Sequence, residues 1–551
     1  MSPAGFEYHF RDADEAPEKP AQYKKTIESG MIVERDFMIP LRDGVELCAD
    51  IFRPADEKPA APIIAWTPYG KHVPLRPERY LDCGLKYESV SPYTAFEAPD
   101  PQYWVPHGYA VILVEIRGTW KSGGDALFVA PEECYDIYDV IEWSAAQPWS
   151  NGKVGMSGVS YLALMQWRVA ELHPPSLAAI NPWEGWSDTY REVAFHGGIP
   201  DSWFWPALHR RWGAGLSRLE DLAKENAEHR FYDAYWESKS ANLEEITTPA
   251  FVVSSWTDQG LHTRGTLKGF EKISSEQKWL DVHADKKWRH YYLPESLARL
   301  KVFFDHFLKG IDNEISEWPK VRYNLRDRFL VGTIKSDTSW PLANTDYRPL
   351  YLDAASGTMQ ESLPAAETQV SYNSLEADGG PNEATFDFKF EKTTDVVGHM
   401  KLKLWVSADE ADDMDLFVSV EKIDVFGNRV GYPYYMQFDD GSVALGWLRV
   451  SHRELDLEKS TPHQPVLAHQ RELKLEPGEI VPVEIEIWPS GTLFHAGDTL
   501  RVVVQGSDIH KYDKKWAMYC RHEVLENKGK HTIYSGGQYD SHLLVPVTNE
   551  Q

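Results

Sequence analysis

The sequence has little cysteine, no basic tract and no long apolar run. Its four cysteines form no CxxC pair and no cluster with histidine at zinc-ligand spacing, which argues against a disulfide scaffold and a structural zinc site. Acidic residues outnumber basic ones by 84 to 57, and the resulting formal charge of −27 argues against a nucleic-acid partner. Because the first thirty residues lack an apolar core and no stretch of about 18 apolar residues occurs, we expect a soluble cytoplasmic protein without a membrane partner.

What the chain does have is enough apolar material for several cores. Hydrophobic residues make up 42% of its 551 residues and aromatic residues 13%, so length and composition predict a globular protein of two or three domains. Tryptophan is abundant, with 21 copies, of which 17 precede residue 350. Most of the large aromatic side chains therefore belong to the first part of the chain.

Strand and helix patterns divide the chain. Residues 31–54 contain two β-rich runs around a turn, and short apolar runs then alternate with helical patterns, as in a parallel α/β sheet. Between about 183 and 247 we find no convincing strand, and after about 347 alternating runs follow one another with little helix. The expected parts are an N-terminal arm (1–30), an α/β body in two pieces (31–182 and 248–346), a helical cap (183–247) and an all-β jelly-roll domain (347–551).

The stretch GMSGVSYLALMQW, residues 155–167, has the pattern of a nucleophile elbow. Ser160 lies between a predicted strand and a predicted helix, with Gly158 two residues before it and Ala163 three after it. Such a sharp turn brings neighbouring chain close, so it needs small residues. The usual pattern would have glycine at 162, where this chain has leucine, and a tight βα turn with a capping serine remains an alternative reading. Ser157 has the poorer flanks, so Ser160 is the preferred nucleophile.

In an α/β-hydrolase fold an acid and a histidine should follow the serine, each at the end of a strand. Asp258 comes directly after the apolar run AFVVSSW, and His283 follows KWLDV 25 residues later. The other histidines have weaker positions, since His262 lies in a predicted helix, His290 in a polar stretch and His306 on the face of a long helix. We therefore predict Ser160, Asp258 and His283 as a catalytic triad.

At these residues the chain resembles the cocaine-esterase-like (CocE/NonD) hydrolases, which include cocaine esterase, α-amino-acid ester hydrolases, glutaryl-cephalosporin acylases and X-Pro dipeptidyl-peptidases. The resemblance spans most of the chain, through IPLRDGVELCADIFRP, TPYGK (67–71), RGTWKSGG (117–124), EWSAAQPWSNGKVGMSGVSYLALMQW, SDTYR (187–191), SSWTD (254–258) and FFDHFLKGIDN (303–313). It implies an α/β-hydrolase fold with a helical cap and a C-terminal jelly roll. It also implies that the Tyr69 hydroxyl and the Tyr161 amide form the oxyanion hole.

One motif departs from the family. Its members often carry a Gly-Pro-Trp-x-His type sequence that ends in the base, whereas this chain reads KWLDVH, with His283 last. His290 is therefore kept as the alternative candidate for the base. The expected reaction is cleavage of an ester or amide bond of a small molecule through an acyl-enzyme on Ser160, without metal or cofactor. The alternatives are an X-Pro dipeptidyl-peptidase type aminopeptidase and a non-catalytic binding protein. Assembly into a homo-oligomer is left open.

Tryptophans gather where the sheet gives way to the cap. Aromatic side chains there are able to line an acyl or aryl pocket, and equally able to fasten the cap to the sheet. Acidic side chains in the same stretch are the candidates for holding a substrate α-amino group. The tryptophans are Trp183, Trp186, Trp203, Trp205 and Trp212, and the acids are Glu184, Asp188, Glu192 and Asp201.

Overall fold

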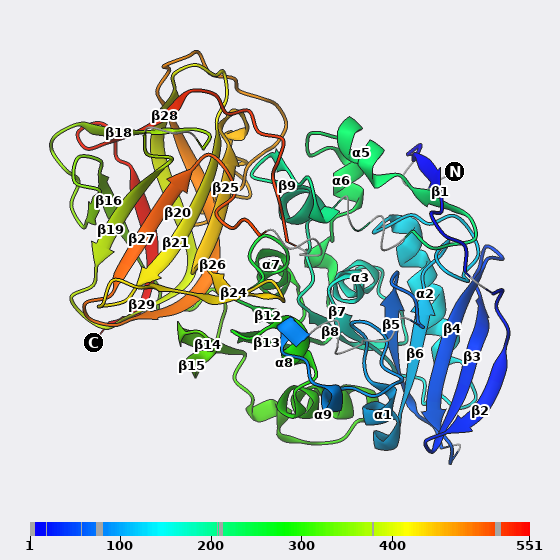
Figure 1. Ribbon diagram of the computed structural model, residues 1–551. Helices are drawn as coiled ribbons and strands as arrows, with labels where there is room; N and C mark the ends of the chain where they lie inside the picture. Colours follow the sequence, from blue (N-terminus) through cyan, green and yellow to red (C-terminus); the bar gives the residue numbers. More distant parts are fainter. Residues whose placement is uncertain are drawn as a thin grey trace.

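The computed structural model places an α/β part beside a β-rich C-terminal part (Figure 1). It describes residues 6–17, 19–56, 58–72, 81–205, 208, 213–376, 380–512 and 519–550. Two apolar cores occupy the two parts, although the first of them also takes in a few side chains from the C-terminal strands. Within the described residues no helix is long and apolar enough to cross a membrane.

One twisted sheet forms the centre of the α/β part. Neighbouring strands pair in the order β2, β3, β4, β6, β5, β7, β8, β12, β13, β14, β15. Pairing is antiparallel from β2 to β6 and parallel from β6 to β14, so the expected hairpin over 31–54 is confirmed, with Met31 opposite Pro54. The strands are β2 (Lys24–Glu28), β3 (Met31–Pro40), β4 (Glu46–Pro54), β5 (Ala61–Thr67), β6 (Tyr109–Glu115), β7 (Val154–Val159), β8 (Leu177–Trp183), β12 (Ala250–Ser255), β13 (Lys278–His283), β14 (Val321–Arg328) and β15 (Val331–Asp337).

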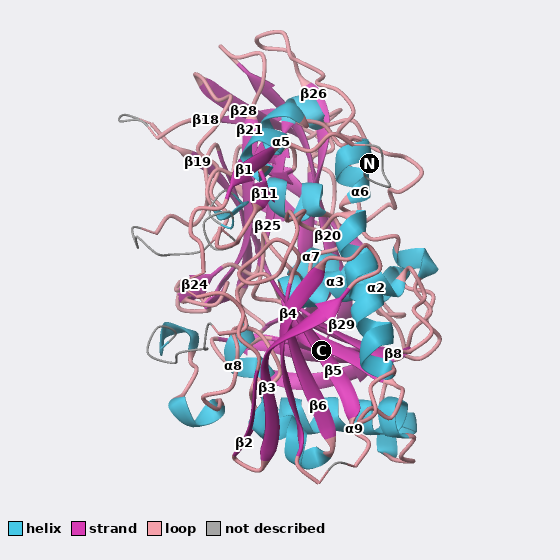
Figure 2. Ribbon diagram, turned by 90° about the vertical axis from the view of Figure 1, so that its right-hand side faces the viewer, coloured by secondary structure: helices cyan, strands magenta, loops and turns pink. Residues whose placement is uncertain are grey.

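Helices cover both faces of this sheet, which is why β5, β6 and β7 consist entirely of buried residues. On one face α7 packs so closely on α3 that a Cβ at Gly269 would lie 2.7 Å from the Trp167 ring. On the other face α9 packs against Gly155 of β7 and, through Phe304, against Trp104 of α1. Figure 2 views the sheet from the edge that carries β2 and β3. The helices are α1 (Pro101–Trp104), α2 (Pro131–Ala145), α3 (Tyr161–Ala170), α7 (Thr263–Lys272), α8 (Lys287–Tyr291) and α9 (Pro294–Lys309).

Short elements connect β8 to β12, where the sequence predicts a helical insertion. Helices α5 (Leu222–Glu228) and α6 (Ala234–Ser238) and a π-helical turn, Tyr190–Ala194, lie there. The segment also holds three strands of two or three residues each, which the sequence pattern did not predict: β9 (Phe195–His196), β10 (Ile199–Pro200) and β11 (Arg218–Glu220). Strand β11 pairs with β1 (Phe10–Asp12), so the N-terminal residues run along this insertion.

The C-terminal part is built almost wholly from antiparallel strands around a second apolar core. The long strands β20 and β26 pair along most of their length, from Thr394 opposite Phe494 to Val406 opposite Val481. Among the described residues, one parallel bridge, between Arg326 of β14 and Thr492 of β26, pairs this part with the α/β sheet. The strands are β16 (Asp346–Asp353), β17 (Thr358–Gln360), β18 (Thr368–Asn373), β19 (Glu383–Lys389), β20 (Thr394–Ala408), β21 (Asp415–Ile423), β22 (Arg429–Val430), β23 (Tyr432–Tyr434), β24 (Phe438–Gly441), β25 (Ala444–Arg449), β26 (Val481–Phe494), β27 (Thr499–Gln505), β28 (Lys530–Ser535) and β29 (His542–Glu550).

Candidate active site

Ser160 occupies a strained turn between β7 and α3. Its φ of 63° and ψ of −116° form a combination that residues other than glycine rarely adopt. Gly158 and Gly185 make the turn possible, because a Cβ at Gly158 would lie 2.5 Å from the Leu162 Cβ and one at Gly185 would lie 2.8 Å from the Ala163 Cβ. The strand, sharp turn and helix expected around Ser160 are therefore present, and the crowding explains the small residues at 158 and 163.

A continuous set of hydrogen bonds joins Ser160 to a histidine and an acid. The Oγ of Ser160 lies 3.1 Å from Nε2 of His262, and Nδ1 of His262 is hydrogen-bonded to Oδ2 of Asp258. Since an ionised carboxylate can only accept, Nδ1 carries the hydrogen, and Nε2 is left to accept from the serine hydroxyl. The His262 and Asp258 side chains are buried, whereas Ser160 keeps 6% of its surface exposed. This is the arrangement in which an imidazole can take a proton from a serine.

The charges around the imidazole favour its neutral form. Burial lowers the pKa of His262, the charge of Lys287 lowers it further, and Asp258 offsets only part of the effect. Burial by itself would raise the pKa of Asp258, but the charges of Lys287 and His262 outweigh it and hold that pKa well below its usual range. At neutral pH the pair therefore consists of a carboxylate and a neutral imidazole, which is the state that a general base needs.

The expectation that His283 faces Ser160 is contradicted. His283 ends β13 beside Ser255 of β12, and its Nδ1 accepts the backbone N–H of Asp285 over 3.2 Å, so its Nε2–H donates to Oε1 of Glu184 over 2.9 Å. His290, the reserve, stacks on His283 with ring centroids 3.9 Å apart and so lies against that histidine. Both side chains are committed to a neighbouring cluster, and the imidazole on Ser160 belongs to His262.

Sequence reasoning missed His262 because it assigned the residue to a helix. The structure places it immediately before α7, in a turn closed by hydrogen bonds from the backbone amides of Leu261, His262 and Thr263 to the carbonyl of Asp258. Residues four apart in such a turn lie on one face, so their side chains can meet. The spacing Asp258-x-x-x-His262 was the signal that could have identified the pair.

The C-terminal part holds this turn from outside. The Gln259 side chain donates to the carbonyl of Pro489 over 3.0 Å and accepts the amide of Leu445 over 3.2 Å. The Tyr435 hydroxyl donates to the carbonyl of Gly260 over 3.0 Å, and the Tyr435 amide donates to the carbonyl of Thr257. The position of Asp258 and His262 thus depends on residues of both parts of the chain.

The two residues expected at the oxyanion hole lie at the ends of neighbouring strands. Tyr69 follows β5, is 8% exposed and packs edge-on against Phe96. Tyr161 is the first residue of α3, where backbone N–H groups point out of the helix, and its hydroxyl donates to Glu133 over 2.7 Å. The Tyr161 hydroxyl is therefore engaged by Glu133. The group of Tyr161 that fits the expected oxyanion hole is its backbone amide.

The tryptophans of the insertion divide into separate groups. Trp186 stacks on His262 with ring centroids 5.6 Å apart and planes 16° apart, so it covers the base. Trp183 packs against His283, His290 and Tyr291 instead. The Asp201 carboxylate accepts the backbone amides of both Trp203 and Trp205, and the Arg521 guanidinium lies over the Trp203 ring. Trp212 lies outside the described residues.

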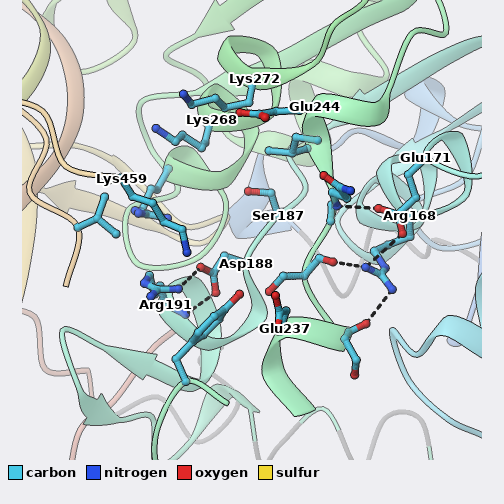
Figure 3. A pocket seen from close by; sticks show the side chains of 18 of the residues that line it. Arg168, Glu171, Ser187, Asp188, Arg191, Glu237, Glu244, Lys268, Lys272 and Lys459 are labelled. Carbon is cyan, nitrogen blue, oxygen red and sulfur yellow. Dashed lines mark hydrogen bonds and ion pairs between the residues drawn. The ribbon is translucent and has the colours of Figure 1, made fainter. Parts of the chain in front are cut away.

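A cavity of about 810 Å³ lies between the insertion, α3 and α7, and Ser160, Asp258 and His262 are not among the residues that line it (Figure 3). Ser187 and Arg264 line it, and each is close in sequence to a member of the site, Trp186 or His262. Its walls carry both signs of charge: Lys268, Lys272 and Lys459 at one side of the view, Glu171 and Arg168 at the other, and the Asp188–Arg191 ion pair below. Mixed charge of this kind selects no single class of ligand.

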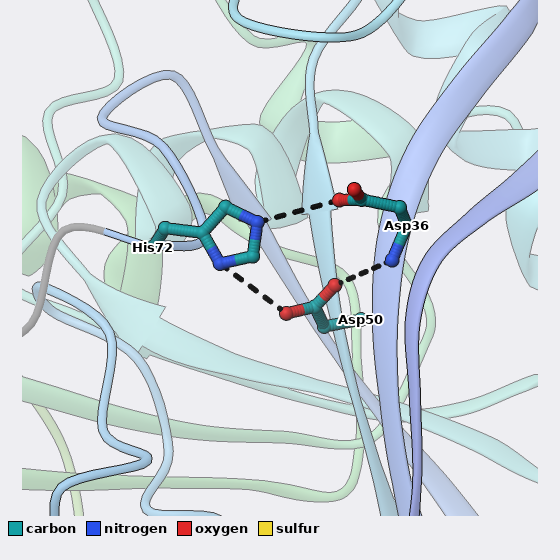
Figure 4. Close-up of side chains that lie close together, drawn as sticks. All are labelled: Asp36, Asp50 and His72. Carbon is teal, nitrogen blue, oxygen red and sulfur yellow. Dashed lines mark hydrogen bonds and ion pairs between the residues drawn. The ribbon is translucent and has the colours of Figure 1, made fainter. Parts of the chain in front are cut away.

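Two carboxylates and a histidine lie together beside the antiparallel strands β3 and β4 (Figure 4). Asp36, Asp50 and His72 lie close enough to share an ion. Two ammonium groups already neutralise the acids, because Lys71 lies 2.5 Å from Asp36 and 2.9 Å from Asp50, and Lys121 lies 2.8 Å from Asp36. A metal ion would have to compete with both lysines, so we read the cluster as a structural ion-pair network.

Comparisons with known proteins agree with this architecture. The model of the X-Pro dipeptidyl-peptidase (S15) family matches residues 43–208 and 203–292, and that of the X-Pro dipeptidyl-peptidase C-terminal non-catalytic domain matches residues 313–544. Cocaine esterase from Rhodococcus sp. (strain MB1 Bresler) is 25% identical over 95% of this chain and 99% of its own. An aminopeptidase from a marine sediment archaeon, Thaumarchaeota archaeon, shares the fold, with 16% identity and a TM-score of 0.71 over 97% of this chain and 99% of its own.

A solved structure from Staphylococcus aureus, described as a CocE/NonD family hydrolase, is considerably more similar. It is 44% identical, with a TM-score of 0.92 over 97% of both chains. That likeness extends over the α/β part and the β-rich part alike. Taken with the serine elbow described above, it shows that this chain belongs to the CocE/NonD family of hydrolases and is a serine hydrolase.

Proposed function

We propose that this enzyme cleaves an ester or amide bond of a small molecule through an acyl-enzyme on Ser160. In this proposal His262 is the general base and Asp258 orients it, in place of the His283 expected from the sequence. The observation that carries the proposal is the hydrogen-bonded series from Ser160 Oγ through both ring nitrogens of His262 to Asp258. The reaction class itself follows from such a series at an elbow.

The steps follow from the geometry. Ser160 attacks the substrate carbonyl while its proton passes to Nε2 of His262, which then delivers it to the leaving group. The Tyr161 amide and the Tyr69 hydroxyl are the proposed donors to the oxyanion, on the strength of their places after β7 and β5. Water activated by the same imidazole then releases the acyl group from Ser160.

The acidic side chains of the insertion give little support to recognition of a substrate α-amino group. An aminopeptidase needs a carboxylate available to the substrate ammonium, yet each candidate already has partners. Glu184 binds His283 and Ser255, Asp188 binds Arg191, Glu192 binds Arg264, and Asp201 binds backbone amides. We therefore place the X-Pro dipeptidyl-peptidase activity second, although the S15 family model carries that name.

For the C-terminal part we propose a jelly-roll sandwich that supports the catalytic turn and takes no part in the chemistry. The support is the antiparallel pairing of its strands and the contacts of Gln259 and Gly260 with its residues. The family model matching this region is described as non-catalytic.

Active-site labelling combined with a substrate panel tests the proposal. A fluorophosphonate probe should label the wild type and not Ser160→Ala, because only an activated serine reacts with it. Ser157→Ala is the matched control, since Ser157 hydrogen-bonds Asn181 and Tyr291 and should leave labelling intact. The panel would contain p-nitrophenyl esters, aryl esters, a β-lactam acyl amide and an X-Pro p-nitroanilide. Turnover of the X-Pro p-nitroanilide alone would favour the dipeptidyl-peptidase activity. Labelling of Ser160→Ala would overturn the assignment of Ser160 as the nucleophile.

A further inference from the structure

A buried lysine touches both residues that serve Ser160. Nζ of Lys287 lies 2.8 Å from Oδ2 of Asp258 and 3.1 Å from Nδ1 of His262. The lysine side chain is 1% exposed, so water screens its charge very little. Lys287 is the first residue of α8, so it reaches Asp258 from a separate element 29 positions along the chain.

The hydrogens at this contact can be assigned. The ammonium only donates, and Nδ1 of His262 already holds the hydrogen that it gives to Asp258, so the lysine donates to the carboxylate and not to the ring. Oδ2 of Asp258 therefore accepts both bonds. The lysine is left 3.1 Å from a ring nitrogen to which it cannot donate. An imidazolium there would place two positive charges side by side.

The surrounding charges keep Lys287 protonated. Burial alone would lower the pKa of Lys287, but Asp258, Glu184 and Glu97 outweigh it and raise that pKa. The charged groups that act most strongly on His262 are Lys287, Asp258 and, to a smaller extent, Glu184. Glu184 is itself held by His283 and Ser255, and burial raises its pKa to about 7.

We propose that Lys287 is a positioning residue of the Ser160 site: its ammonium fixes the Asp258 carboxylate and disfavours a resting imidazolium at His262, so that the base stays neutral into the acid range. The inference rests on the proposed function, because it assigns His262 the proton transfer. It adds to that function a residue outside the serine, histidine and acid, and a reason for the enzyme to work below the ordinary pKa of histidine.

Variants at Lys287 separate its charge from its hydrogen bond. Lys287→Gln keeps a donor for Asp258 and loses the charge, whereas Lys287→Arg keeps the charge. For Lys287→Gln we expect the acid limb of kcat/KM to move upward by about one to three pH units, and for Lys287→Arg to stay near that of the wild type. Lys286→Gln is the matched control, because the adjacent lysine pairs with Asp439 and should leave the limb unchanged.

Other outcomes overturn the inference. A Lys287→Gln enzyme with lower kcat at every pH but an unmoved acid limb would mean that the lysine only supports the fold. Complete inactivity of folded Lys287→Gln at all pH values would mean that the lysine does more than set the protonation of the base. If the glutamine variant does not fold, the same comparison is made with Lys287→Met.

His262→Ala distinguishes failure of this inference from failure of the proposed function. Wild-type turnover by His262→Ala would sink the assignment of the base, whatever Lys287 does. If His262→Ala is inactive and the acid limb of kcat/KM in Lys287→Gln stays where it is in the wild type, only the proposed role of the lysine is wrong. As a spectroscopic check, the low-field proton on Nδ1 of His262 should titrate at a higher pH in Lys287→Gln than in the wild type.

Discussion

Ser160 and His262 are 102 positions apart in the chain, and their side chains meet at 3.1 Å. The serine comes from the turn after β7, and the histidine from the turn after β12, two strands away in the parallel sheet. Parallel strands bring their carboxyl ends to one edge of the sheet, which is where this pair lies. The consequences for activity, pH dependence and stability can be measured.

The identity of the base is the first of these. His262→Ala should reduce kcat at least about 10³-fold, because no other imidazole is hydrogen-bonded to Ser160 among the described residues. His283→Ala removes a partner of Glu184 and should cost stability while keeping kcat within about tenfold of the wild type. Steady-state hydrolysis of a p-nitrophenyl ester checks both, with His290→Ala alongside. A dead His283→Ala beside an active His262→Ala would reverse the assignment.

The pH profile follows from the environment of His262. Burial and the charge of Lys287 lower the pKa of this imidazole below its ordinary 6.5, and the base acts only when it is unprotonated. The kcat/KM of the wild type should therefore fall on the acid side with a midpoint below pH 6.5. Initial rates on a neutral ester that does not ionise give this midpoint directly. A midpoint above 6.5 would show that the imidazolium is favoured and would contradict the charge arrangement.

Crowding at the elbow gives a third prediction. Gly185→Ala would put a Cβ 2.7 Å from the amide nitrogen of Leu164, at the start of the helix that follows Ser160. Since the neighbour is backbone, the chain must shift, and we expect a loss of about 1–3 kcal/mol of stability together with reduced turnover. Gly123→Ala is the control, because its nearest neighbour would be at an ordinary 3.4 Å. Thermal unfolding and ester hydrolysis are measured on both, and equal behaviour of the two variants would refute the steric explanation.

A buried ion pair beside the catalytic turn gives a fourth. Glu192 is fully buried, binds the Arg264 guanidinium over 2.6 Å and accepts the amides of Ser187 and Asp188. Glu192→Gln removes one of the two carboxylates of the buried Arg264 guanidinium, which keeps Glu486 at 2.9 Å. We therefore expect a loss of about 1–3 kcal/mol, seen as a lower thermal midpoint. Glu454→Gln, at the exposed pair with Arg471, should leave that midpoint unchanged. Equal midpoints for Glu192→Gln and the wild type would show that the pair is dispensable.

Signals close together in the sequence predicted much of the fold and part of the site. The alternation of strand and helix, the hairpin over 31–54 and the turn at Ser160 all depend on neighbouring residues. Asp258 follows its strand as expected. The sequence pattern favours His283 over His262 as the base, because His283 comes at the end of a strand. In the structure His283 is hydrogen-bonded to Glu184. The approach of Lys287 to Asp258 depends on how two loops fold against each other, and no local pattern encodes it.

The contacts of Gln259 and Gly260 with the C-terminal strands bear on how such enzymes can be divided or recombined. Two of these contacts use backbone groups of the C-terminal part, the carbonyl of Pro489 and the amide of Leu445. Any sequence can supply such groups if its strands follow the same path. The third contact needs a particular side chain, the hydroxyl of Tyr435. A transplanted β domain would therefore have to reproduce one side chain and the course of two strands to keep Asp258 and His262 in place. A chain shortened to its α/β part would lose the hydrogen bonds that hold the turn carrying Asp258 and His262.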